Sequence, residues 1–333
     1  MNKLTKLGVS ALCGSLAAVS AQAGELTVKG GATATYTSLE GQTTGNPIGL
    51  SSGMTFTGSG ELDNGSTFAL TLTHTDQSAY SAGNIAITTP SMGKFTIQQS
   101  GGGIDRYDDM MPTAWEETNG TGLATGLDTV AGVGAAGNIE WTAPADMLGD
   151  GISLQVAYSP TATGGNINDK GVGGDSGKTG AGWDITASHN GLVDGLNVFV
   201  GHSTQEQAKE NNDSDRTERV IGATYAVGNF TVGYQWSKES LNPTTAASVS
   251  YYENDAFGIS FAVNDDLSIS YGKHKSDKVT NAATSTELDG DSIQLAYSMG
   301  GASIKIAETS VSDGKYNTAN DQDATTVALT LAF

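Results

Sequence analysis

The chain has 333 residues with 16 basic and 36 acidic side chains, which gives a formal net charge of −20 at pH 7. This acidic balance excludes a nucleic-acid-binding function, because such proteins need a basic surface. Glycine is abundant with 45 residues, proline is scarce with six, and a single cysteine excludes a disulfide-stapled scaffold. Beyond the N-terminal segment, no stretch is long and apolar enough to predict a membrane-spanning helix.

The N-terminus has the organisation of a secretory signal peptide. Two lysines precede a short apolar run, and Ala21-Gln-Ala23 is a small-x-small cleavage sequence. We therefore expect a signal peptide over residues 1–23 and a mature protein over residues 24–333. The single cysteine, Cys13, lies in the signal, so the mature chain has none.

From Glu25 onward, apolar and polar residues alternate with a period of two, which is the pattern of β-strands. Most alternating segments have about 8–11 residues, the length that a tilted strand needs to cross the hydrocarbon core of a membrane. Sixteen segments are predicted, at 25–36, 53–62, 67–75, 83–89, 94–100, 137–143, 152–159, 182–189, 195–204, 217–227, 229–237, 254–263, 266–275, 290–298, 302–310 and 323–333.

Short and long connections alternate along this series. The short ones are tight-turn sequences rich in Gly and Asn, such as Asp63-Asn-Gly-Ser66. The long ones are polar and fall at 37–52, 76–82, 101–136, 160–181, 205–216, 238–253, 276–289 and 311–322. An even strand count with all long loops on one side is typical of outer-membrane barrels. A soluble β-sandwich is the alternative, and eight long loops in phase disfavour it.

The two faces of each strand differ in polarity. The apolar face, as in Phe68, Leu70 and Leu72, carries no charge at mid-strand, where a Lys or Arg facing lipid would cost about 2–4 kcal/mol. The opposite face predicts the pore wall, whose charged residues are Lys29, Glu61, Lys94, Glu140, Asp184 and Lys305. Only a closed barrel satisfies the backbone of strands in lipid. The sequence therefore predicts an all-β fold, a 16-stranded antiparallel transmembrane β-barrel.

The last predicted strand indicates how the barrel closes. Val327, Leu329, Leu331 and Phe333 alternate with small residues, and the chain then stops. A bare apolar edge strand would invite pairing with other chains. We therefore expect residues 323–333 to pair with residues 25–36.

Aromatic residues gather near the predicted strand ends, as expected of two girdles at the level of the lipid head groups. On the short-turn side they are Phe68, Phe95, Trp141, Tyr225, Phe230, Phe261, Tyr297 and Phe333. On the long-loop side they are Tyr36, Tyr158, Trp183, Trp236 and Tyr271.

The chain resembles the general (diffusion) porins of Gram-negative bacteria, most closely the alphaproteobacterial type. The residues that carry the likeness are Ala21-Gln-Ala23, Glu25-Leu-Thr-Val-Lys-Gly30, the hairpin from Met54 to Gly65, Phe95-Thr-Ile97 and the terminal Phe333. The resemblance implies a homotrimer in the outer membrane that lets small hydrophilic solutes diffuse passively through a water-filled channel. It also implies that Phe333 is the signal read by the barrel assembly machinery, and that the third loop folds into the pore.

The third loop, residues 101–136, is the longest connection and needs a role in a compact protein. Its negative charge comes from Asp105, Asp108, Asp109, Glu116 and Glu117. Its apolar side chains, Ile104, Met110, Met111 and Trp115, are expected to pin it to the inner wall. A solvated acidic outer loop is the alternative, and the apolar content disfavours it.

In the porin family an acidic third loop faces a basic cluster on the wall. This sequence departs from that pattern, because the mature chain has only three arginines, Arg106, Arg216 and Arg219, and few lysines of lumen parity. We therefore predict a constriction with net negative potential and a preference for cations, as carboxylate rings provide in other channels.

Two further expectations concern the outer surface of the barrel. The outer loops carry acids that would bind divalent cations bridging to lipopolysaccharide, or would simply be solvated; no other cofactor is implied. Small outward residues in the first two strands, such as Ala32 and Gly58, would allow subunits to pack closely.

Two other functions are alternatives to a diffusion channel. A substrate-selective nutrient channel would need a ladder of binding residues along the lumen, and no clear ladder is present. An exported β-rich adhesin or surface-structural protein would be water-soluble. The four histidines lie on separate strands without metal-ligand spacing, and no catalytic motif points to an enzyme.

Overall fold

The computed structural model describes residues 24–332 except 42–44, 77–81, 119, 121–122, 124 and 163–179. The predicted signal peptide, residues 1–23, and the predicted assembly signal, Phe333, lie outside the described residues.

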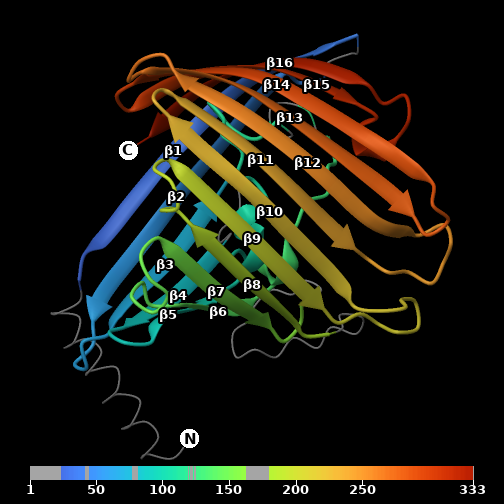
Figure 1. Ribbon diagram of the computed structural model, residues 1–333. Coiled ribbons are helices and arrows are strands. Elements are labelled where there is room, and N and C mark those ends of the chain that lie inside the picture. The colour runs from blue at the N-terminus through green and yellow to red at the C-terminus, as the bar shows by residue number, and fades with distance from the viewer. Residues whose placement is uncertain are drawn as a thin grey trace, which may run out of the picture.

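Sixteen antiparallel strands form one closed barrel, in which every strand pairs with its neighbours along the chain and β1 pairs with β16 (Figure 1). They are β1 (Leu26–Glu40), β2 (Ile48–Glu61), β3 (Thr67–Thr75), β4 (Ala82–Thr89), β5 (Gly93–Gln98), β6 (Asn138–Thr142), β7 (Ile152–Ser159), β8 (Gly182–His189), β9 (Leu196–Gln205), β10 (Arg216–Val227), β11 (Phe230–Ser240), β12 (Val249–Ala262), β13 (Leu267–Thr280), β14 (Ser285–Met299), β15 (Ala302–Ser312) and β16 (Gln322–Ala332). The predicted fold class is confirmed.

Within the described residues, helical structure is confined to the loops. Three short 3-10 turns are described: η1 (Gly103–Tyr107) and η2 (Gly132–Ala135) in the third long loop, and η4 (Gly314–Tyr316) in the last one. None of the helices in the described ranges is long and apolar enough to span a bilayer.

The seam between the first and last strands closes as the sequence predicts. The β1–β16 ladder runs from Gly31 opposite Ala332 to Glu40 opposite Asp323. On its inner face the hydroxyl groups of Thr33 and Thr330 lie 3.0 Å apart, within hydrogen-bond distance. The edge strand therefore has a partner along most of its length, which removes the exposed edge.

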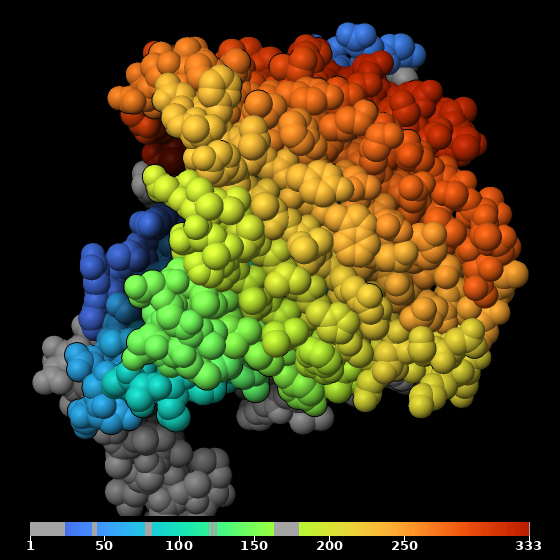
Figure 2. Space-filling model, in the orientation of Figure 1, coloured from blue at the N-terminus to red at the C-terminus, as the bar shows by residue number. Residues whose placement is uncertain are grey.

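The outer surface of the barrel is more apolar than the surface of a water-soluble protein. Leu50 is 77% exposed and Ile293 62% exposed, and both belong to a continuous outward set of large apolar side chains. Figure 2 shows one side of this outer face, over the strands from β8 to β15. Soluble monomers rarely expose apolar patches of this extent, whereas lipid covers them in a membrane barrel.

Aromatic side chains pair across strands at the short-turn end. The rings of Phe230 on β11 and Phe261 on β12 have centroids 4.4 Å apart. Phe95 lies opposite Trp141 in the β5–β6 register, and the Trp141 indole donates to the Met92 carbonyl oxygen at 2.7 Å. These contacts lie where the sequence places one of the two girdles.

Several strands extend further than predicted at the long-loop end. Residues 276–289 were expected to form a loop, but β13 and β14 continue through most of this range and leave only residues 281–284 as the turn. The strong charge of this segment led to the prediction of a solvated loop, and that prediction was wrong. Cross-strand ion pairs explain the strand: Lys273 lies 2.9 Å from Asp289, and Lys275 lies 3.1 Å from Glu287. Opposite charges on facing strands stabilise the ladder.

Candidate pore constriction

The third long loop leaves β5 and turns inward at Gly101-Gly102-Gly103. All three residues have positive φ angles, +82°, +76° and +55°, which only glycine adopts at little cost. A β-carbon at Gly103 would also collide with the Asp184 carboxylate on β8. The glycines therefore permit both the sharp turn and the close approach of the loop to the wall (Figure 1).

Three buried carboxylates on the wall hold both limbs of the loop through its backbone N–H groups. The hydrogen bonds run from Gly103 to Glu140 on β6 (2.7 Å), from Ile104 (2.9 Å) and Val133 (3.1 Å) to Asp184, and from Ala131 (2.7 Å) and Gly132 (2.8 Å) to Glu218 on β10. Each carboxylate residue is at most 5% exposed. Charge-assisted bonds of this kind are among the strongest that a backbone makes. They fix the loop against one side of the barrel.

Two arginines offset part of the buried negative charge. Arg106, in the loop, forms an ion pair with Glu140. Arg216, on β10, lies 3.0 Å from Glu218 and 2.5 Å from Glu239. Pairing matters because a buried charge without a partner is strongly destabilising. Both guanidinium groups are thereby engaged with acids on the loop-bearing side of the wall.

An apolar cluster packs between the loop and the wall. Ile104, Tyr107 and Val130 of the loop contact Phe199 on β9 and Val220 on β10, and all five are buried. The Tyr107 and Phe199 rings have centroids 4.8 Å apart. Here the inner wall carries apolar instead of polar residues, because the loop covers it and excludes water.

The tip of the loop reaches the far strands β14 and β15. Gln294 on β14 accepts from the N–H groups of Trp115 (3.0 Å) and Glu116 (3.2 Å) and donates to the Glu116 carbonyl oxygen (2.8 Å). The Lys305 ammonium on β15 lies 5.9 Å from the centre of the Trp115 ring, within cation–π range. The wall therefore holds the tip of the loop as well as its base.

The last long loop clamps the return limb. The Tyr316 hydroxyl accepts from the Asp128 N–H at 3.1 Å and lies 2.7 Å from the Ser276 hydroxyl on β13. The neighbouring Lys315 N–H donates to the Thr125 carbonyl oxygen at 2.6 Å. Two outer loops that are far apart in sequence thus form one structure over the lumen.

The acidic side chains of the loop lie in a shared electrostatic environment. Burial, together with the charges of Asp109, Asp105 and Glu117, raises the pKa of Asp108 to about 7. Burial is also the main cause that raises the pKa values of Asp105, Glu116 and Glu117. Asp109 is the exposed member of the set. The loop therefore presents concentrated negative charge, part of which responds to pH near neutrality.

The opposite side of the lumen is lined by hydroxyl groups. The inner face of β1, β2, β3 and β16 presents Thr27, Thr33, Thr35, Thr37, Thr55, Thr57, Thr71, Thr73, Thr326 and Thr330. A cavity of about 710 Å³ lies against β2 to β5 and is lined by Glu61, Asn84 and Lys94 among others. The open passage therefore runs between an acidic loop and a largely uncharged wall.

A family model of Gram-negative porins matches residues 8–333. The chain belongs to the Gram-negative porin family. The sixteen-stranded barrel and the inward-folded loop agree with this assignment, and the protein is an outer-membrane β-barrel that forms a diffusion channel. No curated protein matches the chain.

Solved porin structures share the fold at low sequence identity. Salmonella typhi OmpF in complex with daunomycin is 14% identical, covers 92% of this porin and 97% of its own chain, and has a TM-score of 0.71. The trimer form of OmpT, an outer membrane protein of Vibrio cholerae, is 12% identical, with 93% and 99% covered and a TM-score of 0.65. An anion-selective porin from Comamonas acidovorans is 12% identical, with 93% and 99% covered and a TM-score of 0.63.

The predicted loop residues lie together in this porin. Ile104 is fully buried, Met110 and Met111 pack against its cluster, and Trp115 sits at the tip near β15. The five acids Asp105, Asp108, Asp109, Glu116 and Glu117 share the loop, and burial together with neighbouring acids of this set raises the pKa values of Asp105, Asp108, Glu116 and Glu117.

The predicted wall residues divide into two groups. Glu61 and Lys94 line the open cavity, Lys29 is exposed on the inner parity of β1, and Lys305 faces the loop tip. Glu140 and Asp184 instead lie beneath the loop and bind its backbone, so they are not part of the open wall. Alternation along a strand predicts that a residue faces the lumen, but it does not predict whether the third loop covers that residue.

Sequence reasoning missed several residues that hold the loop. Glu218, Gln294 and Tyr316 each bind it directly. The first two have lumen parity in strands whose other inward residues are mostly small, and this contrast is the signal that marks a side chain reaching across the lumen. Nothing in the local sequence marks Tyr316, because its role depends on a contact between two distant loops.

Proposed function

We propose that this porin is a passive, non-catalytic diffusion channel that prefers cations. The observation that supports it is the acidic third loop, whose base is fixed to one side of the wall by Asp184 and Glu218 and which faces a threonine-lined wall. Carboxylates at a constriction attract cations and repel anions. Arg106 of the loop and Arg216 on β10 do not counter this field, because they pair with acids on the loop-bearing side.

The fold by itself permits either ion preference, since one similar structure is an anion-selective porin. The ion preference therefore depends on how the charges of this chain are distributed along the channel. The test is the reversal potential of the purified protein in a planar bilayer across a tenfold KCl gradient. A potential with the sign of potassium permeation supports the proposal, and a potential with the sign of chloride permeation refutes it.

We further propose that the porin is a homotrimer that packs through β1 and β2. The outward face of β1 carries the small residues Gly30, Ala32 and Ala34, which allow close backbone approach. At the long-loop end the same face remains apolar, with Ile48 68% exposed and Leu50 77% exposed, whereas β13 carries charges at that end. The trimer form of OmpT supports the trimer itself, because a barrel of similar fold assembles as three copies there.

Substitution at the packing surface tests the trimer. Ala32→Trp and Gly58→Trp should produce monomers on native gels with an intact, heat-modifiable barrel. Trimers that persist in both variants would refute this interface. We also propose that the signal peptide is cleaved after Ala23 and that the barrel assembly machinery recognises Phe333. In the membrane, the porin contacts outer-membrane lipid and lipopolysaccharide.

A further inference from the structure

Three inward-facing glycines lie side by side on the inner wall where the third loop crosses it. The strand register pairs Gly233 on β11 with Gly258 on β12, and Gly258 with Gly272 on β13. All three are buried, and we call them the glycine track. Their place in the interior of strands needs a reason, because glycine weakens a strand relative to residues that have a side chain.

Backbone conformation does not explain the glycine track. The glycines where the loop leaves the wall, Gly101–Gly103, have positive φ angles, but none of the three track residues does. Any L-residue could therefore adopt the backbone of the track without strain. The close approach of another part of the chain is the other common reason for a glycine within a strand.

The third loop occupies the space above the track. A β-carbon on Gly233 would lie 2.7 Å from Cδ of Pro112, and a β-carbon on Gly258 would lie 2.9 Å from the Pro112 carbonyl oxygen. A β-carbon on Gly272 would collide with the Thr118 hydroxyl. Ordinary contacts between carbon atoms are longer, at about 3.5–4.0 Å. A side chain on the track would therefore need the space that the loop fills.

Hydrogen bonds hold the same part of the loop against the same strands. The Gln235 side chain on β11 donates to the Asp108 carbonyl oxygen at 3.3 Å. The Ser270 hydroxyl on β13 accepts from the Ala114 N–H at 2.8 Å. Each of these wall residues is two positions from a glycine of the track. The loop segment that they hold carries Asp108 and Asp109, so the track also determines where these two acids lie.

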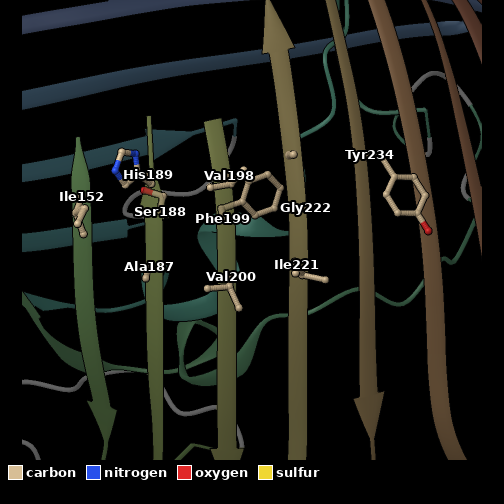
Figure 3. A pocket seen from close by; sticks show the side chains of 11 residues that line it. Ile152, Ala187, Ser188, His189, Val198, Phe199, Val200, Ile221, Gly222 and Tyr234 are labelled. Atoms are coloured by element: carbon tan, nitrogen blue, oxygen red, sulfur yellow. The ribbon is translucent and has the colours of Figure 1, made fainter. Parts of the chain in front are cut away.

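Inward glycines also lie beneath the base of the loop. A β-carbon on Gly201 of β9 would lie 2.8 Å from Cγ1 of Ile104. A β-carbon on Gly222 of β10 would collide with the Phe199 ring, which Figure 3 shows turned toward Gly222. Phe199 in turn packs against Tyr107 of the loop. The loop therefore lies over glycines on every strand from β9 to β13.

We propose that the glycine track sets the width of the channel and, with it, the size of the solutes that pass. Without side chains on the track, the loop lies close to the wall and leaves the space between it and the threonine-lined wall open. A side chain on the track would lift the loop into the lumen, because a close-packed contact does not absorb added volume. The inference rests on the proposed diffusion channel and is independent of the ion preference.

Single-channel conductance in planar bilayers and sugar-driven swelling of proteoliposomes test the inference. The triple variant Gly233→Ala, Gly258→Ala, Gly272→Ala should conduct about 1.5-fold less than the wild type, since the loop has to rise by about 0.5–1 Å to restore ordinary contacts. Entry of raffinose should slow more than entry of arabinose, because the larger sugar is closer to the width of the channel. The reversal potential should keep its sign, because no charge changes.

A double variant controls for the loss of strand glycines in general. Gly53 on β2 and Gly290 on β14 also have inward parity, but the nearest atoms that their β-carbons would meet, apart from chain neighbours, are 3.6 Å and 3.7 Å away. The variant Gly53→Ala, Gly290→Ala should therefore conduct as the wild type does.

A rescue variant tests the contact between the loop and the track itself. Gly233→Ala alone should lower the conductance. Pro112→Ala removes the Cδ atom that a β-carbon on Gly233 would meet. The combination of Gly233→Ala with Pro112→Ala should therefore regain the wild-type conductance, as expected of two residues whose effects are coupled through one contact.

Three results would overturn the inference. One is wild-type conductance and sugar entry in the triple variant, which would mean that the wall absorbs the added atoms. Another is a higher conductance with faster proteolysis of residues 101–136, which would mean that the loop detaches instead of rising. The third is a failure of Pro112→Ala to restore the conductance of Gly233→Ala.

Heat-modifiable mobility on gels confirms that each variant has folded. If the triple variant does not fold, the single variants Gly233→Ala and Gly258→Ala provide the same test with a smaller loss of conductance. A wild-type protein that forms no channel would refute the proposed diffusion function, whereas a conducting wild type with unaffected track variants would refute this inference alone.

Discussion

The backbone N–H of Ile104 donates to the buried Asp184 carboxylate at 2.9 Å, across the space between the third loop and β8. A second bond, from the Val133 N–H at 3.1 Å, ties the return limb to the same carboxylate. One wall residue thus joins both limbs of the loop. The charge at the constriction is consequently held in place instead of moving with a flexible segment.

Removal of this anchor should loosen the loop. Asp184→Ala leaves two buried N–H groups without an acceptor, at a cost of about 1–3 kcal/mol each. We expect larger open-channel current noise in single-channel recordings and faster proteolysis within residues 101–136. Asp323→Ala, at an exposed position of β16, is the matched control. Unchanged noise and proteolysis in Asp184→Ala would show that the anchor is dispensable.

The ion preference should depend on pH through Asp108. Burial and three neighbouring acids raise its pKa to about 7, so the side chain is charged above pH 7 and neutral below it. The ratio of potassium to chloride permeability should therefore rise as the pH increases from 6 to 8. Reversal potentials across this range provide the measurement, and Asp108→Asn should flatten the response.

A neighbouring substitution checks the cause of this pH dependence. The negative charge of Asp109 is one of the causes that raise the pKa of Asp108. Asp109→Asn should therefore shift the midpoint of the permeability change to lower pH while the change itself remains. A midpoint that stays in place, or moves upward, contradicts this assignment.

Lys305 should weaken the field of the loop tip. Its ammonium lies near the Trp115 ring, and its positive charge opposes the burial that raises the pKa of Glu116. Lys305→Gln should increase the ratio of potassium to chloride permeability by about twofold, as expected for a partly screened single charge. Lys315→Gln, in the last long loop, controls for a general loss of positive charge. A lower ratio in Lys305→Gln would contradict the prediction.

The last long loop should act as a clamp on the third. Tyr316→Phe removes the hydroxyl that binds the Asp128 N–H and Ser276, a loss of about 1 kcal/mol for each bond. We expect more frequent current fluctuations with an unchanged reversal potential, because the acids of the tip stay in place. Recordings that match the wild type would show that the backbone contact of Lys315 suffices.

Strand number, order and closure were predictable from the sequence because a two-residue alternation survives in every segment and ends in tight turns. How far the strands extend at the long-loop end was not predictable. In β13 and β14 the alternating residues are Lys, Asp and Glu, which resemble a solvated loop until the ion pair of Lys275 with Glu287 is known. Such pairs are a property of the register between strands, which single-strand composition does not contain.

The part of the site that the composition of the third loop determines was predictable. The acids and apolar residues of the third loop identified a segment that has to lie against a surface. The partners on the wall were not predictable, because Glu140 and Asp184 have the same parity as residues that face open water. Only the path of the loop distinguishes a buried acceptor such as Glu218 from a pore-lining charge such as Glu61.

We propose that four acids of the third loop, Asp108, Asp109, Glu116 and Glu117, set the ion preference. The most direct test compares the wild type with a variant that carries Asp108→Asn, Asp109→Asn, Glu116→Gln and Glu117→Gln, through reversal potentials in a KCl gradient at pH 8. We predict a clear potassium preference in the wild type and a permeability ratio near one in the variant, with conductance retained because the backbone contacts of the loop remain. A variant as cation-preferring as the wild type would contradict the claim.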